Sequence, residues 1–136
     1  MQITLVQPAF VDAIWPRISE GLDKAIKRAG GDISPGYLWQ ECRGGRTFLL
    51  VAHEDDRVSG ASVWRHETWQ DGPAMRCLAM YGAAGHFKEL QAEGKRLANH
   101  CGADRIVFEG RKGWARSPLF DGFKVRELRV VYEIRD

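Results

Sequence analysis

The stretch MYGAAGHFKEL at residues 80–90 decides the fold, because it turns a strand into a helix within a few residues. The run AMRCLAMY that leads into it reads as a strand, and Phe87, Leu90 and Leu97 recur afterwards at helical spacing. Glycines let a backbone approach a ligand closely, and the amides at a helix N-terminus attract anions. The stretch therefore predicts a strand-to-helix elbow whose backbone is suited to a phosphate group.

The chain before this elbow reads as a strand, two helices and a three-stranded antiparallel meander. Apolar residues recur at helical spacing from residue 10 to 28, and Gly30 and Gly31 end that helix. Ser34 is placed to cap a second, shorter helix that has Pro35 at its first position. The meander strands are TFLLVAHE, RVSGASVWRHETW and AMRCLAMY, separated by turns at DD and QDGP.

After the elbow the predicted order is helix, strand, short helix and final strand. The helix over residues 86–101 is followed by DRIVFEG, a buried strand. Because a crossover helix joins parallel strands, the strands on its two sides are expected to lie parallel. Gly94, in the middle of this helix, predicts a place where the helix packs close to the sheet. The predicted fold class is a mixed α/β sheet, antiparallel in its first half, in one domain over residues 1–136.

Composition narrows the class of protein without naming a function. The formal net charge of +2 gives no reason to expect a membrane or a specific nucleic-acid partner. Cys42, Cys77 and Cys101 lack CxxC spacing, which favours a reducing compartment, and no set of residues has the spacing of a metal motif. With no signal peptide and no apolar run near the length of about 20 residues that a membrane span needs, we expect a cytoplasmic protein.

The stretch CGADRIVFEGRKGWARSPLFDGFKV at residues 101–125 carries a family resemblance. A helix that ends in a glycine, a strand, a short helix and the pair Gly122–Phe123 opening a last strand follow one another in it. Together with the element order, this resembles the GNAT acyltransferase fold over essentially the whole chain. The resemblance implies acyl transfer from acetyl-CoA to an amine on a small molecule or a protein.

The resemblance also implies where acetyl-CoA would bind. In GNAT enzymes the strand before the elbow hydrogen-bonds the pantetheine arm, and an elbow of the type Gln/Arg-x-x-Gly-x-Gly/Ala wraps the pyrophosphate. This chain departs from that pattern, because Tyr81 stands where Gln or Arg is expected. The alternative is a tight connection that needs small residues only for packing. The implied cofactor-binding residues are Leu78, Met80, Tyr81, Gly82, Ala83, Ala84, Gly85, His86, Phe87 and Lys88.

The catalytic groups are less well marked. Pro118 occupies the position, four residues before the Gly-Phe pair, where the family has a tyrosine that protonates the departing thiolate. Acyltransferases of this type often activate the amine with an acidic or histidine base on the middle strands. Glu54, His66 and Glu67 are the candidates here, and solvated strand residues are the alternative reading.

A second resemblance suggests a different use of the same fold. The pattern FEGRKGW…GF also looks like small GNAT-like proteins encoded among the virion genes of tailed bacteriophages. It implies a catalytically inactive virion or assembly protein, with other virion proteins as partners and the host cytoplasm or the virion as its location.

Overall fold

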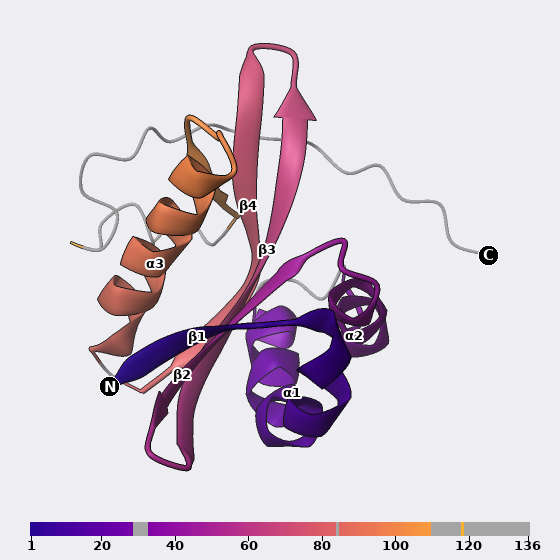
Figure 1. The fold of residues 1–136 in the computed structure, drawn as a ribbon, viewed down its shortest axis with the longest axis vertical. Coiled ribbons are helices and arrows are strands. Elements are labelled where there is room, and N and C mark those ends of the chain that lie inside the picture. Colours follow the sequence, from indigo (N-terminus) through magenta and orange to yellow (C-terminus); the bar gives the residue numbers. More distant parts are fainter. Residues whose placement is uncertain (29–32, 84, 110–117, 119–136) are drawn as a thin grey trace.

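The computed structural model describes residues 1–28, 33–83, 85–109 and 118. In this part of the chain, one sheet carries α1 and α2 on one face and α3 on the other (Figure 1). The elements in chain order are β1 (Gln2–Val6), the 3-10 turn η1 (Pro8–Phe10), α1 (Val11–Arg28), α2 (Pro35–Arg43), β2 (Phe48–Glu54), β3 (Arg57–Trp69), β4 (Gly72–Gly82), α3 (His86–His100) and β5 (Ile106–Phe108).

The sheet has five strands among the described residues, in the order β1-β2-β3-β4-β5. The first four strands run antiparallel to their neighbours, and β5 runs parallel to β4. The predicted mixed sheet is therefore confirmed, with its antiparallel meander and its parallel pair around a crossover helix. The short helix expected over residues 111–120 and the strand expected over 122–136 lie outside the described residues, apart from Pro118, which is exposed.

The helices α1 and α2 form where the apolar periodicity and the capping residues predict them. Ile18, Leu22 and Ile26 of α1 are buried against the sheet in one apolar core. The Ser34 hydroxyl accepts a hydrogen bond from the Tyr37 amide at 3.1 Å, which satisfies one of the free amides at the start of α2. Both helices cover the face of the sheet that Val51, Ala61 and Val63 line, as the cluster of buried residues shows.

The helix α3 covers the opposite face and packs around Trp64. A Cβ on Gly94 would lie 2.9 Å from Trp64 Cε2, and closer still to two other atoms of that fully buried ring. The Trp64 ring also meets Phe108 of β5 edge-on, with ring centroids 5.5 Å apart. The predicted close approach at Gly94 is thus confirmed, and one tryptophan joins α3, β3 and β5.

Two irregularities interrupt the strand pairing. Val63 pairs with Ala79 but Trp64 pairs with Cys77, so Leu78 is an extra residue on β4. Likewise Ala52 pairs with Gly60 but His53 pairs with Val58, leaving Ser59 extra on β3.

No described helix is both long enough and apolar enough to cross a membrane.

Candidate functional site

The site begins where the pairing of β5 with β4 ends. The two strands pair over three residues, ending at Cys77 with Phe108, and the bulge at Leu78 follows immediately. Beyond it, no described strand pairs with the outer edge of β4. Ala83 N donates to Ser59 O at 3.1 Å, and bonding direction alternates along an antiparallel strand. The peptide groups of Met80 and Gly82 therefore point away from β3, toward the side on which β5 lies.

The elbow between β4 and α3 lies at the end of this open edge. Gly85 has φ +90° and ψ −15°, a left-handed conformation that favours glycine, and a Cβ there would meet no other group. His86 N donates to Ala83 O at 3.0 Å and closes the turn, and α3 starts at His86. The strand-to-helix elbow is confirmed, and Ala84 lies outside the described residues.

Gly82, the last residue of β4, lies against the first turns of α3. A Cβ on Gly82 would come within 3.4 Å of both the His86 Cβ and the Leu90 Cδ1. Phe87, the next residue of α3, is half-buried. The start of α3 thus packs directly on the end of β4.

The N-terminus of α3 presents backbone amides without a side-chain cap. Lys88 in this turn is exposed and adds positive charge, whereas Glu89 adds negative charge. Two buried polar atoms near the elbow, His86 Nδ1 and Ser59 Oγ, have no hydrogen-bond partner among the described residues. Such unsatisfied buried atoms are uncommon and cost about 1–3 kcal/mol each.

The side chains of the β4 residues predicted to bind cofactor are used for packing. Leu78 is buried in the core under α1, and the Tyr81 ring fills the space beside Gly21 of α1. Burial raises the pKa of Tyr81 above its ordinary value. Met80 packs on the α3 side of the sheet. Of these residues, Met80 can therefore offer a ligand its outward peptide groups, whereas the peptide groups of Tyr81 face β3.

Glu67 lies at the centre of a half-buried group of ion pairs. Its carboxylate accepts hydrogen bonds from Arg65 at 2.7 and 3.0 Å, from Arg76 at 2.9 and 3.0 Å and from Trp69 Nε1 at 2.9 Å. Burial alone would raise the pKa of Glu67, but the hydrogen bonds from Trp69, Arg65 and Arg76 outweigh it and hold the pKa below its ordinary value. A carboxylate so fully occupied is poorly suited to accept a proton from a substrate.

The other two predicted bases lie apart from each other. His66 is exposed and pairs in register with Met75, near the far end of the β3–β4 hairpin. Glu54 ends β2 beside the β2–β3 turn, 4.0 Å from the N-terminal amine. The structure therefore brings His66 and Glu67 to one region of β3 and leaves Glu54 at another. Their role as bases stays a prediction.

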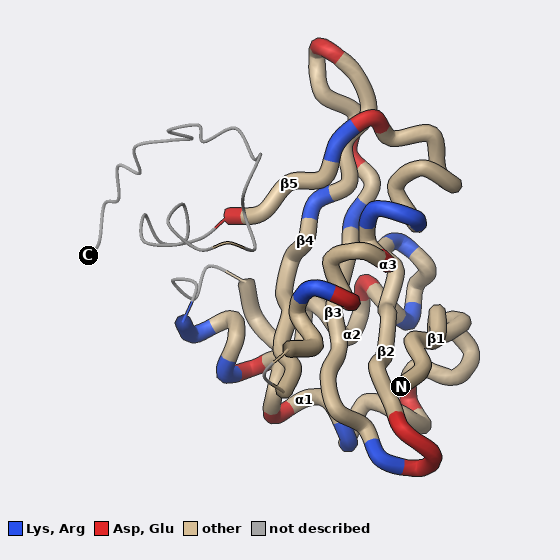
Figure 2. The backbone as a smooth tube through the Cα atoms, turned by 90° about the vertical axis from the view of Figure 1, so that its left-hand side faces the viewer, with Lys and Arg blue, Asp and Glu red and all other residues tan. Residues whose placement is uncertain are grey.

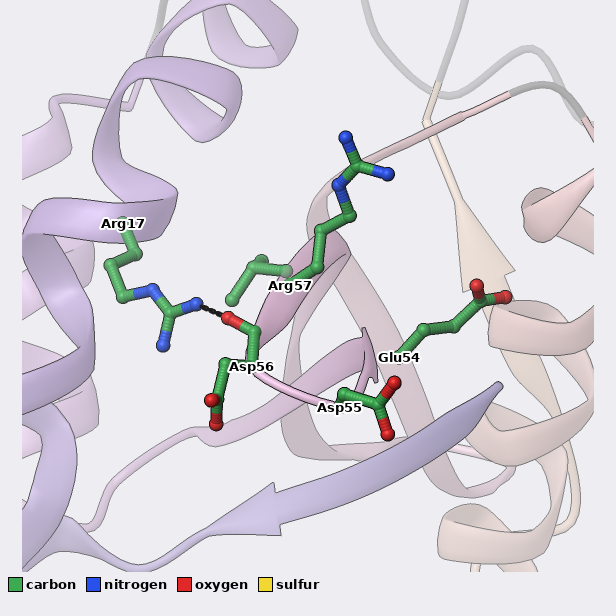
Figure 3. A pocket seen from close by; sticks show the side chains of 6 residues that line it. Arg17, Glu54, Asp55, Asp56 and Arg57 are labelled. Carbon is green, nitrogen blue, oxygen red and sulfur yellow. Dashed lines mark hydrogen bonds between the residues drawn. The ribbon is translucent and has the colours of Figure 1, made fainter.

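Glu54 also borders a shallow hollow of about 670 Å³ at that turn. Arg17 of α1 donates to the Asp56 carbonyl on one side of it, while the Glu54 side chain points away from Arg17 (Figure 3). Asp55, Arg57 and Val58 complete the lining. Along the sheet as a whole, basic and acidic positions are intermixed rather than gathered on one face (Figure 2). The hollow lies at the end of the sheet where Ser59, the residue after Val58, accepts a hydrogen bond from Ala83 of the elbow.

The comparisons with known proteins bear on the fold. No protein-family model matches the sequence, and a search of curated proteins finds no match. A probable acetyltransferase superposes with a TM-score of 0.72 at 15% identity, covering 100% of both chains. A GNAT family acetyltransferase of Staphylococcus aureus superposes with a TM-score of 0.66 at 14% identity, covering 98% of both chains. The chain has the GNAT fold.

A further GNAT-like match connects the fold with a ligand. A predicted acetyltransferase of Clostridium acetobutylicum, determined with acetyl-CoA, superposes with a TM-score of 0.71 at 10% identity, covering 97% of this chain and 95% of that one. At identities this low, the superpositions establish the GNAT fold alone, and the activity has to be argued from the site itself.

Sequence reasoning located the elbow of this GNAT fold but missed what opens the edge beside it. The bulge at Leu78 and the end of pairing at Phe108 are set by register between strands, which no local pattern in the sequence reports. The ion pair between Arg76 and Glu109 was missed for the same reason, because the two residues are 33 positions apart. The available sequence signal for this group of ion pairs was the opposite charges of Arg65 and Glu67, which are two positions apart and so lie on one face of β3.

Proposed function

We propose that this chain is an acyltransferase that uses acetyl-CoA to acylate an amine, on a small molecule or a protein, in the cytoplasm. The observation that carries the proposal is the outer edge of β4 beyond Cys77, with which no described strand pairs. The peptide groups of Met80 and Gly82 turn toward the side on which β5 lies, and the edge leads directly to the elbow at Gly85. The GNAT fold supports the same reading.

The residues at this edge fit the parts of acetyl-CoA. Outward-facing amides and carbonyls at Met80 and Gly82 match an amide-containing arm such as pantetheine, which pairs with a strand edge as another strand would. The amides at the start of α3 match a pyrophosphate, and exposed Lys88 adds a positive charge close by. Because these contacts are made by the backbone, the departure of Tyr81 from the family pattern does not remove them.

When bound, acetyl-CoA supplies an acyl group activated as a thioester. This chain would hold that group by its β4 edge and elbow, so that an amine entering from the other side can attack the carbonyl carbon while the thiolate departs. Correct placement alone can supply about 7–11 kcal/mol of the barrier reduction. We propose positioning as the main source of catalysis. Glu54, His66 and Glu67 stay candidate bases, and His66 is the first to test because the Glu67 carboxylate is already occupied.

A thermal-shift titration with CoA and acetyl-CoA tests the proposal. A ligand at 100 times its dissociation constant stabilises a fold by about 2.7 kcal/mol. We expect a saturable rise in melting temperature with either ligand and none with ATP at equal concentration, because ATP lacks the pantetheine arm. An amine panel assayed for thiol release would then define the acceptor. No shift at millimolar CoA would remove the acyltransferase reading.

The inactive virion or assembly protein is the second candidate from the sequence. It rests on a sequence resemblance alone, and the comparisons give it no support. Failure to bind CoA in the titration would bring it back into consideration.

A further inference from the structure

The side chain of Arg76 connects β3 to the end of β5, close to the position where the pairing of β5 with β4 ends. Arg76 lies one residue before Cys77, the last residue of β4 that pairs with β5, and its side chain is 16% exposed. Its Nε donates to both oxygens of Glu67 on β3, and its Nη1 forms an ion pair with Glu109, the residue that follows β5. The Arg76 side chain thus connects β3, β4 and the end of β5 near the position where the pairing of β4 with β5 ends.

The opposite face of the sheet is fixed at the same position. Phe108, the last residue of β5, packs edge-on against the Trp64 ring, which is itself held against Gly94 of α3. Its neighbour Glu109 bonds back to Arg76. The end of β5 is therefore held by an aromatic contact on one face and by an ion pair on the other.

A second arginine provides an internal comparison. Arg65 donates to Glu67 Oε2 at 3.0 and 2.7 Å, much as Arg76 does, but this ion pair joins two residues of β3. Both arginines thus contribute to the same carboxylate, and Arg76 additionally reaches the chain beyond β5. A planar guanidinium suits this task because its donors can engage two carboxylates at once.

We propose that Arg76 is a positioning residue for acyl-CoA binding: by joining Glu67 to Glu109, it fixes where the pairing of β5 with β4 ends and thereby where the outer edge of β4 becomes accessible to a ligand. The inference rests on the proposed function of that edge. It assigns Arg76 no contact with the ligand and no part in the chemistry. Its effect is on the geometry of the outward peptide groups of Met80 and Gly82, further along β4.

The experiment compares Arg76→Met with Arg65→Met in the full chain. Both variants remove an arginine from Glu67, so both are expected to lower the melting temperature. We expect Arg76→Met to raise the dissociation constant for CoA at least tenfold by isothermal titration calorimetry, and Arg65→Met to change it less than twofold. Glu109→Gln should weaken binding in the wild-type background and add nothing in the Arg76→Met background, because the two residues act through one contact.

Amide hydrogen exchange separates this inference from the proposed function. The Val107 amide of β5, which faces β4 in the parallel ladder, should exchange faster in Arg76→Met than in the wild type, and at the wild-type rate in Arg65→Met, whether or not CoA binds. If the wild type fails to bind CoA but the two variants show this exchange pattern, the proposed function is overturned and the Arg76 contact stands. Equal effects of the two arginine variants on CoA binding and on β5 exchange would overturn the positioning role.

Discussion

Replacing Gly94 by alanine tests the packing that holds α3 on the sheet. In an exposed helix the change would be stabilising, because alanine favours a helix over glycine by about 1 kcal/mol. Here the added methyl group would enter the space of the Trp64 ring, which is fully buried and also contacts Phe108. The local preference and the tertiary packing therefore predict opposite signs.

The size of the effect follows from the geometry. The methyl carbon would lie 2.9 Å from Trp64 Cε2 and nearer to two other ring atoms, against about 3.5–4.0 Å for an ordinary carbon contact. Overpacking typically costs about 1–3 kcal/mol, and an overlap with a fully buried ring belongs at the upper end. Subtracting the gain of about 1 kcal/mol in helix preference leaves a net loss of about 2 kcal/mol. For a chain of this size, that corresponds to a melting temperature lower by roughly 5–8 °C.

Thermal melts followed by circular dichroism measure this difference, with Gly36→Ala as the matched control. Gly36 lies in the first turn of α2, where an added Cβ meets no atom within 4 Å, so this variant should melt at or slightly above the wild-type temperature. A Gly94→Ala protein that is as stable as the wild type, or more stable, would refute the account of α3 packing.

Three further predictions follow from named contacts. Gly85→Glu, at φ +90°, should weaken CoA binding at least tenfold by placing a carboxylate at the elbow, whereas Gly102→Glu, at φ +77° at the other end of α3, should cost similar stability and leave CoA affinity unchanged in calorimetry. Because the folded pKa of Glu67 is lowered, its carboxylate stabilises the fold above the ordinary glutamate pKa of about 4.3 and loses that effect as pH falls through the folded value. Urea unfolding below about pH 4 should therefore depend less on pH in Glu67→Gln than in the wild type, and equal slopes would argue against the ion-pair group. Ser34→Ala should lower the unfolding free energy by about 1 kcal/mol through loss of the bond to the Tyr37 amide, and a neutral result in urea melts would show that water replaces the cap.

Local patterns predicted the elements that local physics determines. Apolar spacing located α3, glycine placement located the elbow, and Ser34 with Pro35 located the start of α2. Each of these depends on residues within one or two helical turns of one another. The same holds for the β2–β3 turn, where Asp55 adopts φ 52°.

The details that open the candidate site depend on contacts between distant segments. The bulge at Leu78 exists only relative to the register of β3, and the Arg76–Glu109 ion pair requires β5 to lie beside β4. His53 shows the same limit, because its ring forms a hydrogen bond with the hydroxyl of Thr4 on β1 at 2.7 Å, between residues far apart in the sequence. The pair Gly122–Phe123, which carried part of the family resemblance, lies outside the described residues.

Residue-resolved amide exchange of β4, with and without CoA, tests the central claim most directly. The claim is that the outward peptide groups of Met80 and Gly82 bind the arm of an acyl-CoA. CoA should slow exchange at these two amides and leave Ala79 and Tyr81, which face β3, nearly unchanged. Saturating CoA that leaves Met80 and Gly82 exchanging at the ligand-free rate would contradict the account.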